Sequence, residues 1–186
     1  MIERVFCPLC KGELIMTKEE MITRLKNTPT QILDSGARRN FDTGAVRDIA
    51  DGKGRCDLIA LEVVGSLLND RNLYLIERYI REGNASRIFE VIHNFACEYF
   101  GDIYTALLEV SKQYEAGAKK YSDRNWEKGI PLHCYIDSGV RHYLKFKRGD
   151  KDEPHDRAFL WNMLGAIWTQ VNKPELNDLP FKKESD

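Results

Sequence analysis

The sequence has few of the features that assign a protein directly to a class. Its five cysteines are an odd number without the spacing of a disulfide framework, which indicates reduced thiols in a cytoplasmic setting. Cys7 and Cys10 form a CxxC motif, but the chain has no second CxxC, and structural zinc normally has four ligands. His133 and Cys134 could complete such a site. The pattern favours a terminal segment without metal over zinc at Cys7 and Cys10.

Long apolar runs are also absent. No stretch is long enough to span a bilayer, and residues 1–16 lack a signal-peptide core followed by a cleavage site. The net charge of −1 gives the chain no general attraction for nucleic acid or for an anionic membrane. We therefore expect a cytoplasmic protein that binds neither, in which any phosphate site comes from a local cluster of lysine and arginine.

Strand-like alternation and internal repeats are absent too, whereas apolar residues recur at helical spacing through most of the chain. The sequence predicts an all-α fold, a bundle of about five or six helices. We divide it into an N-terminal appendage with the lone CxxC (1–36), a helical domain (37–172) and a mobile charged tail (173–186). The helical segments are expected at 17–25, 58–68, 73–80, 86–100, 103–121, 132–146 and 155–171.

Residues 37–59 combine three glycines with basic and acidic side chains. Glycine lets the backbone approach a ligand closely, and the basic side chains Arg47, Lys53 and Arg55 could contact phosphate. The segment is not a P-loop, because the spacing GxxxxGK[ST] is missing. Two interpretations stay open: a phosphate-binding loop, and a solvated loop whose charges pair with each other.

Residues 114–162 are the richest in groups that can hold a metal ion and a phosphate. Glu115 and Lys119 share one helix face, although such a pair is also common as a surface ion pair. The loop at 149–153 has three acids within four positions, an arrangement that a hard divalent cation would stabilise. We predict a Mg²⁺ (or Mn²⁺) site in a helical cleft, with candidate ligands Glu109, Glu115, Asp152, Glu153 and Asp156.

Several of these segments carry a pattern that resembles a known family. The stretches are FDTGAVRD, GKGRCDLI, YEAGAKKYSDRNWEKGIP, DSGVRHYLKF, GDKDEPH and AFLWN. Over about residues 37–169 they resemble the dATP/dGTP diphosphohydrolases of bacteriophages and prophages, a family similar to the MazG-like all-α pyrophosphohydrolases. Two departures are clear: an additional segment intervenes between about 67 and 108, and of the MazG-like ExxE and ExxD pair only the second is present, at 153–156.

The resemblance implies Mg²⁺-dependent hydrolysis of dATP or dGTP to the monophosphate and pyrophosphate, in phage deoxynucleotide metabolism and therefore in the host cytoplasm. It also implies a homo-oligomer. We expect Glu115, Glu153, His142 and His155 to act in catalysis. The residues expected to bind the substrate are Arg47, Lys53, Arg55, Lys119, Lys120, Arg124, Asn125, Trp126, Arg141 and Asn162.

Three alternatives remain. The protein could be a non-catalytic nucleotide-binding or regulatory protein on the same fold, which the missing ExxE motif favours. It could be a zinc-dependent adaptor built on Cys7 and Cys10. It could also be a phosphohydrolase that removes the whole triphosphate and releases the nucleoside.

Overall fold

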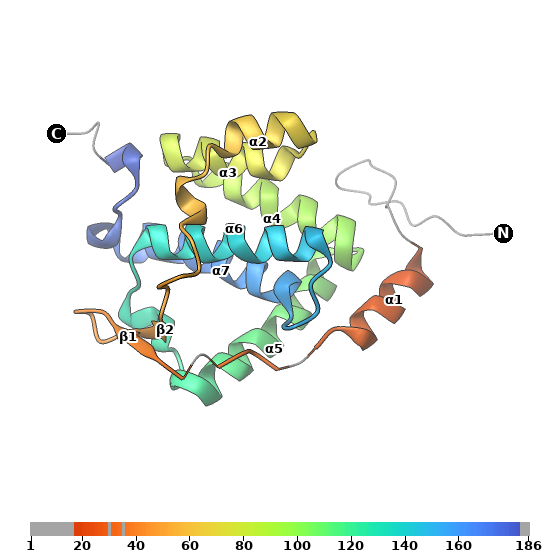
Figure 1. The fold of residues 1–186 in the computed structure, drawn as a ribbon, viewed down its shortest axis with the longest axis horizontal. Coiled ribbons are helices and arrows are strands. Elements are labelled where there is room, and N and C mark those ends of the chain that lie inside the picture. The colour runs from red at the N-terminus through yellow and green to blue at the C-terminus, as the bar shows by residue number, and fades with distance from the viewer. Residues whose placement is uncertain (1–16, 30, 35, 183–186) are drawn as a thin grey trace.

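The computed structural model describes residues 17–182 apart from residues 30 and 35. Figure 1 shows a mainly helical protein in which α6 and α7 lie together at the centre. The predicted all-α class is confirmed, with seven α-helices among the described residues rather than five or six. They are α1 (Lys18–Asn27), α2 (Leu61–Leu68), α3 (Arg71–Glu82), α4 (Ala85–Phe100), α5 (Ile103–Tyr121), α6 (Leu132–Arg148) and α7 (His155–Asn172). No described helix is long and apolar enough to cross a membrane.

Side-chain caps explain where most of the helices begin. Thr17 and Glu20 form the predicted capping box at the start of α1. Asp70, Asn84 and Asp102 accept hydrogen bonds from the first backbone N–H groups of α3, α4 and α5. These caps fix the short connections between consecutive helices, so the apolar stripes of the helices face one another.

The core is centred on an aromatic cluster between α4, α6 and α7. Phe95 lies fully buried, with ring centroids 4.7 Å from Phe159 and 5.9 Å from Tyr143. Burial of large aromatic side chains is among the strongest contributions to packing. Because the cluster joins α4 to α6 and α7, the helices of the 67–108 segment hold the central helix pair in place.

A short β-hairpin is the element that the sequence did not predict. Strands β1 (Arg38–Asn40) and β2 (Val46–Asp48) pair antiparallel. The side chain of Asn125 accepts from the Val46 N–H at 3.1 Å and donates to the Val46 carbonyl at 2.9 Å. The 3-10 turn η2 (Asn125–Lys128) therefore holds the hairpin beside the end of α5.

Both ends of the described chain pack on the helices. Arg24 of α1 forms an ion pair with Asp156 at 2.5 Å, so the predicted N-terminal appendage contacts the start of α7. Residues 174–182, expected in a mobile tail, instead form the 3-10 turns η3 (Pro174–Leu176) and η4 (Pro180–Lys182). Leu179 is buried there, and Asp178 pairs with His133 of α6. Cys7 and Cys10 lie outside the described residues.

Candidate active site

A cavity of about 920 Å³ lies between α5, α6, α7 and the segment from β2 to residue 53. Its wall includes Arg47, Lys53, Tyr114, Trp126, Arg141, His142, Lys145, Glu153, Trp161 and Asn162. The volume falls in the range of small-molecule sites, roughly 300–1,000 Å³. The cavity therefore combines side chains from the two stretches that the sequence marked as chemically rich.

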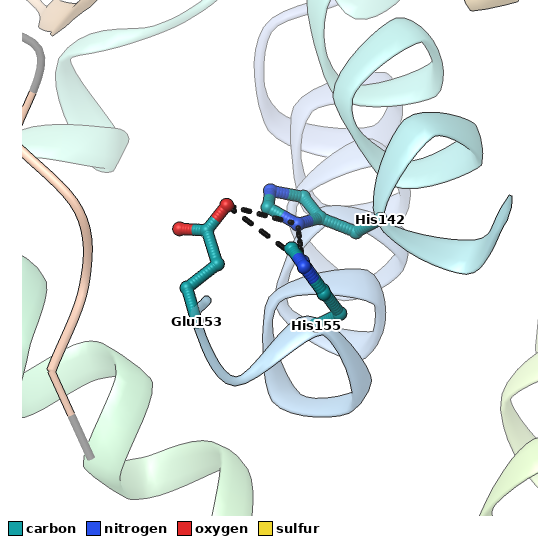
Figure 2. Close-up of side chains that lie close together, drawn as sticks. All are labelled: His142, Glu153 and His155. Carbon is teal, nitrogen blue, oxygen red and sulfur yellow. Dashed lines mark hydrogen bonds and ion pairs between the residues drawn. The ribbon is translucent and has the colours of Figure 1, made fainter. Parts of the chain in front are cut away.

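Two histidines and a glutamate converge at one corner of the cavity, where the end of α6 meets the start of α7. The Nδ1 atoms of His142 and His155 are 2.9 Å apart. The Oε1 atom of Glu153 is 3.7 Å from each of those two nitrogens. Figure 2 shows that the three side chains point toward one another. His142 and Glu153 line the cavity, whereas the side chain of His155 is only 1% exposed.

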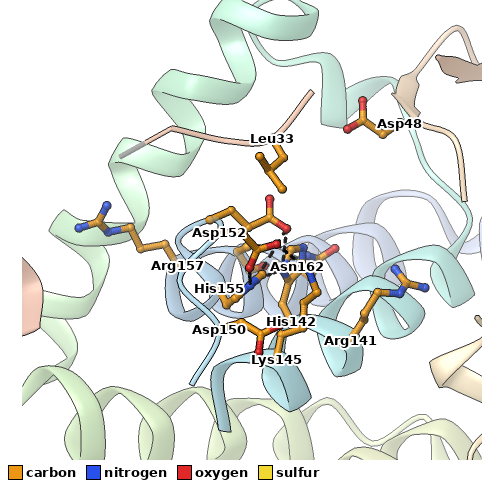
Figure 3. Close-up of polar contacts among 12 residues, drawn as sticks. Leu33, Asp48, Arg141, His142, Lys145, Asp150, Asp152, His155, Arg157 and Asn162 are labelled. Atoms are coloured by element: carbon orange, nitrogen blue, oxygen red, sulfur yellow. Dashed lines mark hydrogen bonds and ion pairs between the residues drawn. The ribbon is translucent and has the colours of Figure 1, made fainter. Parts of the chain in front are cut away.

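A second carboxylate orients the buried histidine. The Nε2 atom of His155 is 2.7 Å from Asp152 Oδ1, and Lys145 donates to Asp152 Oδ2 at 2.8 Å. Because the Asp152 carboxylate accepts a hydrogen bond, Nε2 of His155 carries a proton, and Nδ1 is the ring nitrogen that faces Glu153 and His142. Figure 3 shows Asp152 and Lys145 grouped around His155.

The environment of His142 favours its neutral form. Burial, together with the neighbouring His155 ring and the Arg47, Arg141 and Lys145 cations, holds the pKa of His142 well below its usual 6.5. At neutral pH the imidazole is therefore uncharged and able to accept a proton or to act as a ligand.

Four cationic side chains surround this corner: Arg47, Lys53, Arg141 and Lys145. Arg141 donates to the carbonyls of Lys53 and Gly54 at 3.2 and 3.0 Å and pairs with Asp137. It thereby holds the predicted glycine-containing loop against α6. Glu153 is the one carboxylate of the cavity wall that joins the histidine cluster.

Arg47 is a cation in the cavity wall whose direct partners are neutral. It donates to the Cys134 carbonyl at 3.1 Å and to Asn162 Oδ1 at 3.0 Å, and its guanidinium lies 5.5 Å from the centre of the Trp161 ring. None of the ion pairs among the described residues includes Arg47. Burial lowers the pKa of its guanidinium, which indicates a cation that an anion in the cavity would stabilise.

Aromatic side chains form another part of the wall. Tyr114 has its ring centroid 5.8 Å from that of Trp126 and 6.1 Å from that of Trp161. Trp161 follows His155 by six residues on α7, so it lies about 9 Å along the helix from the histidine cluster. Gln113 also lines the cavity, and its Oε1 is buried without a hydrogen-bond partner among the described residues.

The structure does not bring the five predicted metal ligands together. Glu115 reaches the rim of the cavity, but its side chain is 65% exposed and pairs with Lys119 at 2.5 Å. Asp156 pairs with Arg24, and Glu109 pairs with Arg157, both outside the cavity wall. Of the five, only Asp152 and Glu153 lie at the histidine cluster, because the other three are held in ion pairs elsewhere.

Several predicted substrate-binding residues have other partners. Lys120 donates to Asp48 and to the Leu33 carbonyl at 2.7 and 2.6 Å, and Lys119 and Arg55 lie in exposed ion pairs. The amide of Asn125 is used by Val46, and Arg124 pairs with Glu127 at the cavity edge. The predicted substrate-binding residues that line the cavity are Arg47, Lys53, Arg124, Asn125, Trp126, Arg141 and Asn162, of which Arg124 and Asn125 have the partners named above.

Sequence reasoning missed Lys145, Tyr114, Trp161 and Gln113. Lys145 follows Arg141 by four residues on α6, which places both on one face of the helix. The four-residue spacing could therefore have indicated that Lys145 lies beside Arg141 at the site. Tyr114 lies on the apolar stripe of its helix, and an aromatic at helical spacing packs inward whether or not a cavity borders it.

Comparison with known families adds an independent observation. Residues 99–179 match the model of a family described as dATP/dGTP diphosphohydrolase, N-terminal. These residues are similar to that family. The match confirms the resemblance over α5, α6, α7 and η3. Residues 99–179 include most of the cavity wall but not the hairpin with Arg47. No curated protein and no solved structure matches the chain, so the likeness to MazG-like enzymes stays a prediction.

Proposed function

We propose that this cavity binds a purine deoxynucleoside triphosphate and hydrolyses it between the α and β phosphates, giving the monophosphate and pyrophosphate. The observation that carries the proposal is the cavity itself: the family-matched helices place aromatic side chains and a cationic, histidine-containing corner in one space. In the cell this reaction would lower the concentration of the deoxypurine triphosphate, as the resemblance to phage enzymes implies.

The phosphates occupy the corner between α6 and the loop at residues 50–54. Lys53, Arg141 and Lys145 line this region, and Arg47 stands next to it with neutral partners. Cations placed in a partly enclosed site stabilise the charge of a triphosphate and of the transition state for its cleavage. Exposed ion pairs such as Glu115–Lys119 contribute less to holding the phosphates, because water screens their charges.

The base occupies the aromatic side of the cavity. Tyr114, Trp126 and Trp161 supply ring faces and edges, and stacking of a base on an aromatic side chain contributes about 1–3 kcal/mol. Gln113 supplies a buried amide oxygen, a group that accepts a hydrogen bond from an amino group of the kind on a purine edge.

The attacking water is activated at the His142–Glu153 corner rather than at Glu115. His142 is neutral and borders the cavity, and Glu153 presents a carboxylate beside it. The Glu153 carboxylate can accept the proton that the water loses, and His142 helps to hold the site for that water. Glu115 lies at the exposed rim of the cavity and pairs with Lys119, so we assign water activation to the His142–Glu153 corner instead of to Glu115.

Mg²⁺ enters this proposal with the substrate. The described residues assemble no all-carboxylate site in the cavity, and Mg²⁺ is commonly held through the phosphate oxygens with one or two carboxylates. Glu153 is the carboxylate of the histidine corner that lines the cavity.

The test is a panel of deoxynucleoside and ribonucleoside triphosphates incubated with the protein and Mg²⁺ or Mn²⁺, with products separated by chromatography. We expect dATP or dGTP to give equimolar monophosphate and pyrophosphate. Lys53→Gln should raise KM, whereas Lys112→Gln, a lysine on α5 paired with Glu109 outside the cavity, should not. Release of the nucleoside would refute the proposal in favour of removal of the whole triphosphate, and binding without turnover would refute it in favour of a non-catalytic nucleotide-binding protein.

A further inference from the structure

We propose that His142, His155 and Glu153 form a binding site for a first-row transition-metal ion, of the class Mn²⁺, Fe²⁺, Co²⁺ or Zn²⁺, rather than for Mg²⁺. The inference deepens the proposed function by naming a resident ion, yet it rests on the geometry of the three side chains alone. The ligand atoms are Nδ1 of His142, Nδ1 of His155 and Oε1 of Glu153.

The three atoms have the spacing of metal ligands. Their separations of 2.9, 3.7 and 3.7 Å define a triangle whose corners lie about 2.0 Å from a common centre, matching metal–nitrogen and metal–oxygen bonds of ~2.0–2.2 Å. A hydrogen bond accounts for one side of this triangle at most, because only one proton can lie between the two Nδ1 atoms. An ion at the centre satisfies all three.

The chemistry of the donors selects the ion. Mg²⁺ prefers oxygen ligands and near-octahedral hydration, whereas imidazole suits transition metals. Two imidazoles and one carboxylate make a three-ligand set that leaves positions open for water or substrate, as in catalytic metal sites. Since His142 and Glu153 line the cavity, the open positions face the region that we assign to the phosphates.

The surrounding contacts support the same assignment. Asp152 receives the Nε2–H of His155, and Lys145 holds Asp152 in turn. A carboxylate behind a histidine ligand fixes the ring orientation and raises the basicity of the coordinating nitrogen. An ion bound here lowers the pKa of a bound water toward about 7 and so supplies a nucleophile.

The test is Co²⁺ binding to the full-length, tag-free protein after treatment with a chelator, followed by visible absorption. The Cys7→Ser/Cys10→Ser variant serves as the background, so that the CxxC thiols contribute no signal. We expect about one Co²⁺ per chain, with d–d bands and no thiolate charge-transfer band. A large excess of Mg²⁺ should not displace the ion.

Substitutions then locate the site. Glu153→Gln is nearly isosteric, and it and His142→Gln should each weaken Co²⁺ binding by at least about tenfold. Glu115→Gln and His93→Gln are matched controls, a carboxylate at the cavity rim and a histidine on α4, and both should bind Co²⁺ as the parent does. Equal binding by the Glu153 and His142 variants, or displacement by Mg²⁺ at equal concentration, would overturn the inference.

These measurements use no nucleotide, so the two proposals can fail separately. A protein that binds Co²⁺ at these residues and hydrolyses no triphosphate would refute the function alone. A protein that hydrolyses dGTP and binds Co²⁺ equally well without Glu153 and His142 would refute the metal site alone.

Discussion

Replacing Arg47 by methionine should separate substrate binding from stability. In the protein without ligand, the change removes two hydrogen bonds and leaves Asn162 Oδ1 without its donor, which costs about 1–3 kcal/mol. It also removes a partly buried cation whose direct partners are neutral, and that relief offsets much of the cost. We therefore expect the free energy of unfolding to change by no more than about 1 kcal/mol.

Substrate binding should respond far more strongly. Removing a desolvated charge that contacts an oppositely charged group costs about 2–5 kcal/mol, and each 1.4 kcal/mol is about tenfold in affinity. Arg47→Met should therefore raise KM for dATP or dGTP by at least about thirtyfold. Urea unfolding gives the stability, and steady-state kinetics at fixed ionic strength give KM.

A matched substitution controls for the hairpin. Arg38→Met removes an arginine of β1 whose own side chain does not line the cavity, although its partners Asp34 and Asp48 do. KM should therefore change far less than in Arg47→Met. The reasoning is refuted if Arg47→Met unfolds the protein easily while the folded fraction keeps its normal KM. Arg47 would then be a structural residue of the hairpin.

Three further predictions concern the base, the tail and assembly. Trp161→Leu should raise KM several-fold with a smaller effect on kcat, because it removes a stacking surface and leaves the histidine corner intact; steady-state kinetics measure both. The Asp178 carboxylate raises the pKa of His133 to about 10, so the stability from this pair is fully present below about pH 6.5 and is lost as the pH rises toward 10. Because both side chains are partly exposed, the pair contributes at most about 1 kcal/mol to stability. The measurement is the difference in unfolding free energy between the parent and His133→Asn, at pH 6 and at pH 10. An equal difference at both pH values would contradict the prediction. We also predict a homo-oligomer, since Leu67 and Leu68 of α2 are 81% and 59% exposed; Leu67→Glu should lower the mass found by light scattering, and a monomeric parent would contradict the prediction.

The helices were predictable because their apolar residues repeat at the helical period and their caps are local. The hairpin was not, since RRN and VRD have no apolar alternation, and the contact that fixes β2 comes from Asn125, about eighty positions away. The expectation of a mobile tail had a similar weakness: it rested on the charged composition of residues 173–186, whereas Leu179 is buried.

The site was predictable in its residue types more than in its arrangement. Glu115 was placed correctly on one face with Lys119, but a face shared by two residues does not show whether it borders a cavity. The pairing of His142 and His155 depends on where α6 ends and how α7 returns. Gly149 ends α6 in the left-handed conformation, and the two histidines lie seven and six residues from it. That near symmetry about the turn is the signal that could have located the cluster.

The most direct test of the account is product analysis with dGTP, comparing the parent protein with Glu153→Gln and with Glu90→Gln, a glutamate of α4 paired with Arg71. We predict equimolar dGMP and pyrophosphate from the parent and from Glu90→Gln, and at least a hundredfold lower kcat/KM from a folded Glu153→Gln, on the order of the 10²–10⁴-fold contribution of a general base. A parent that releases no pyrophosphate, or a Glu153→Gln variant as active as the parent, would contradict the account.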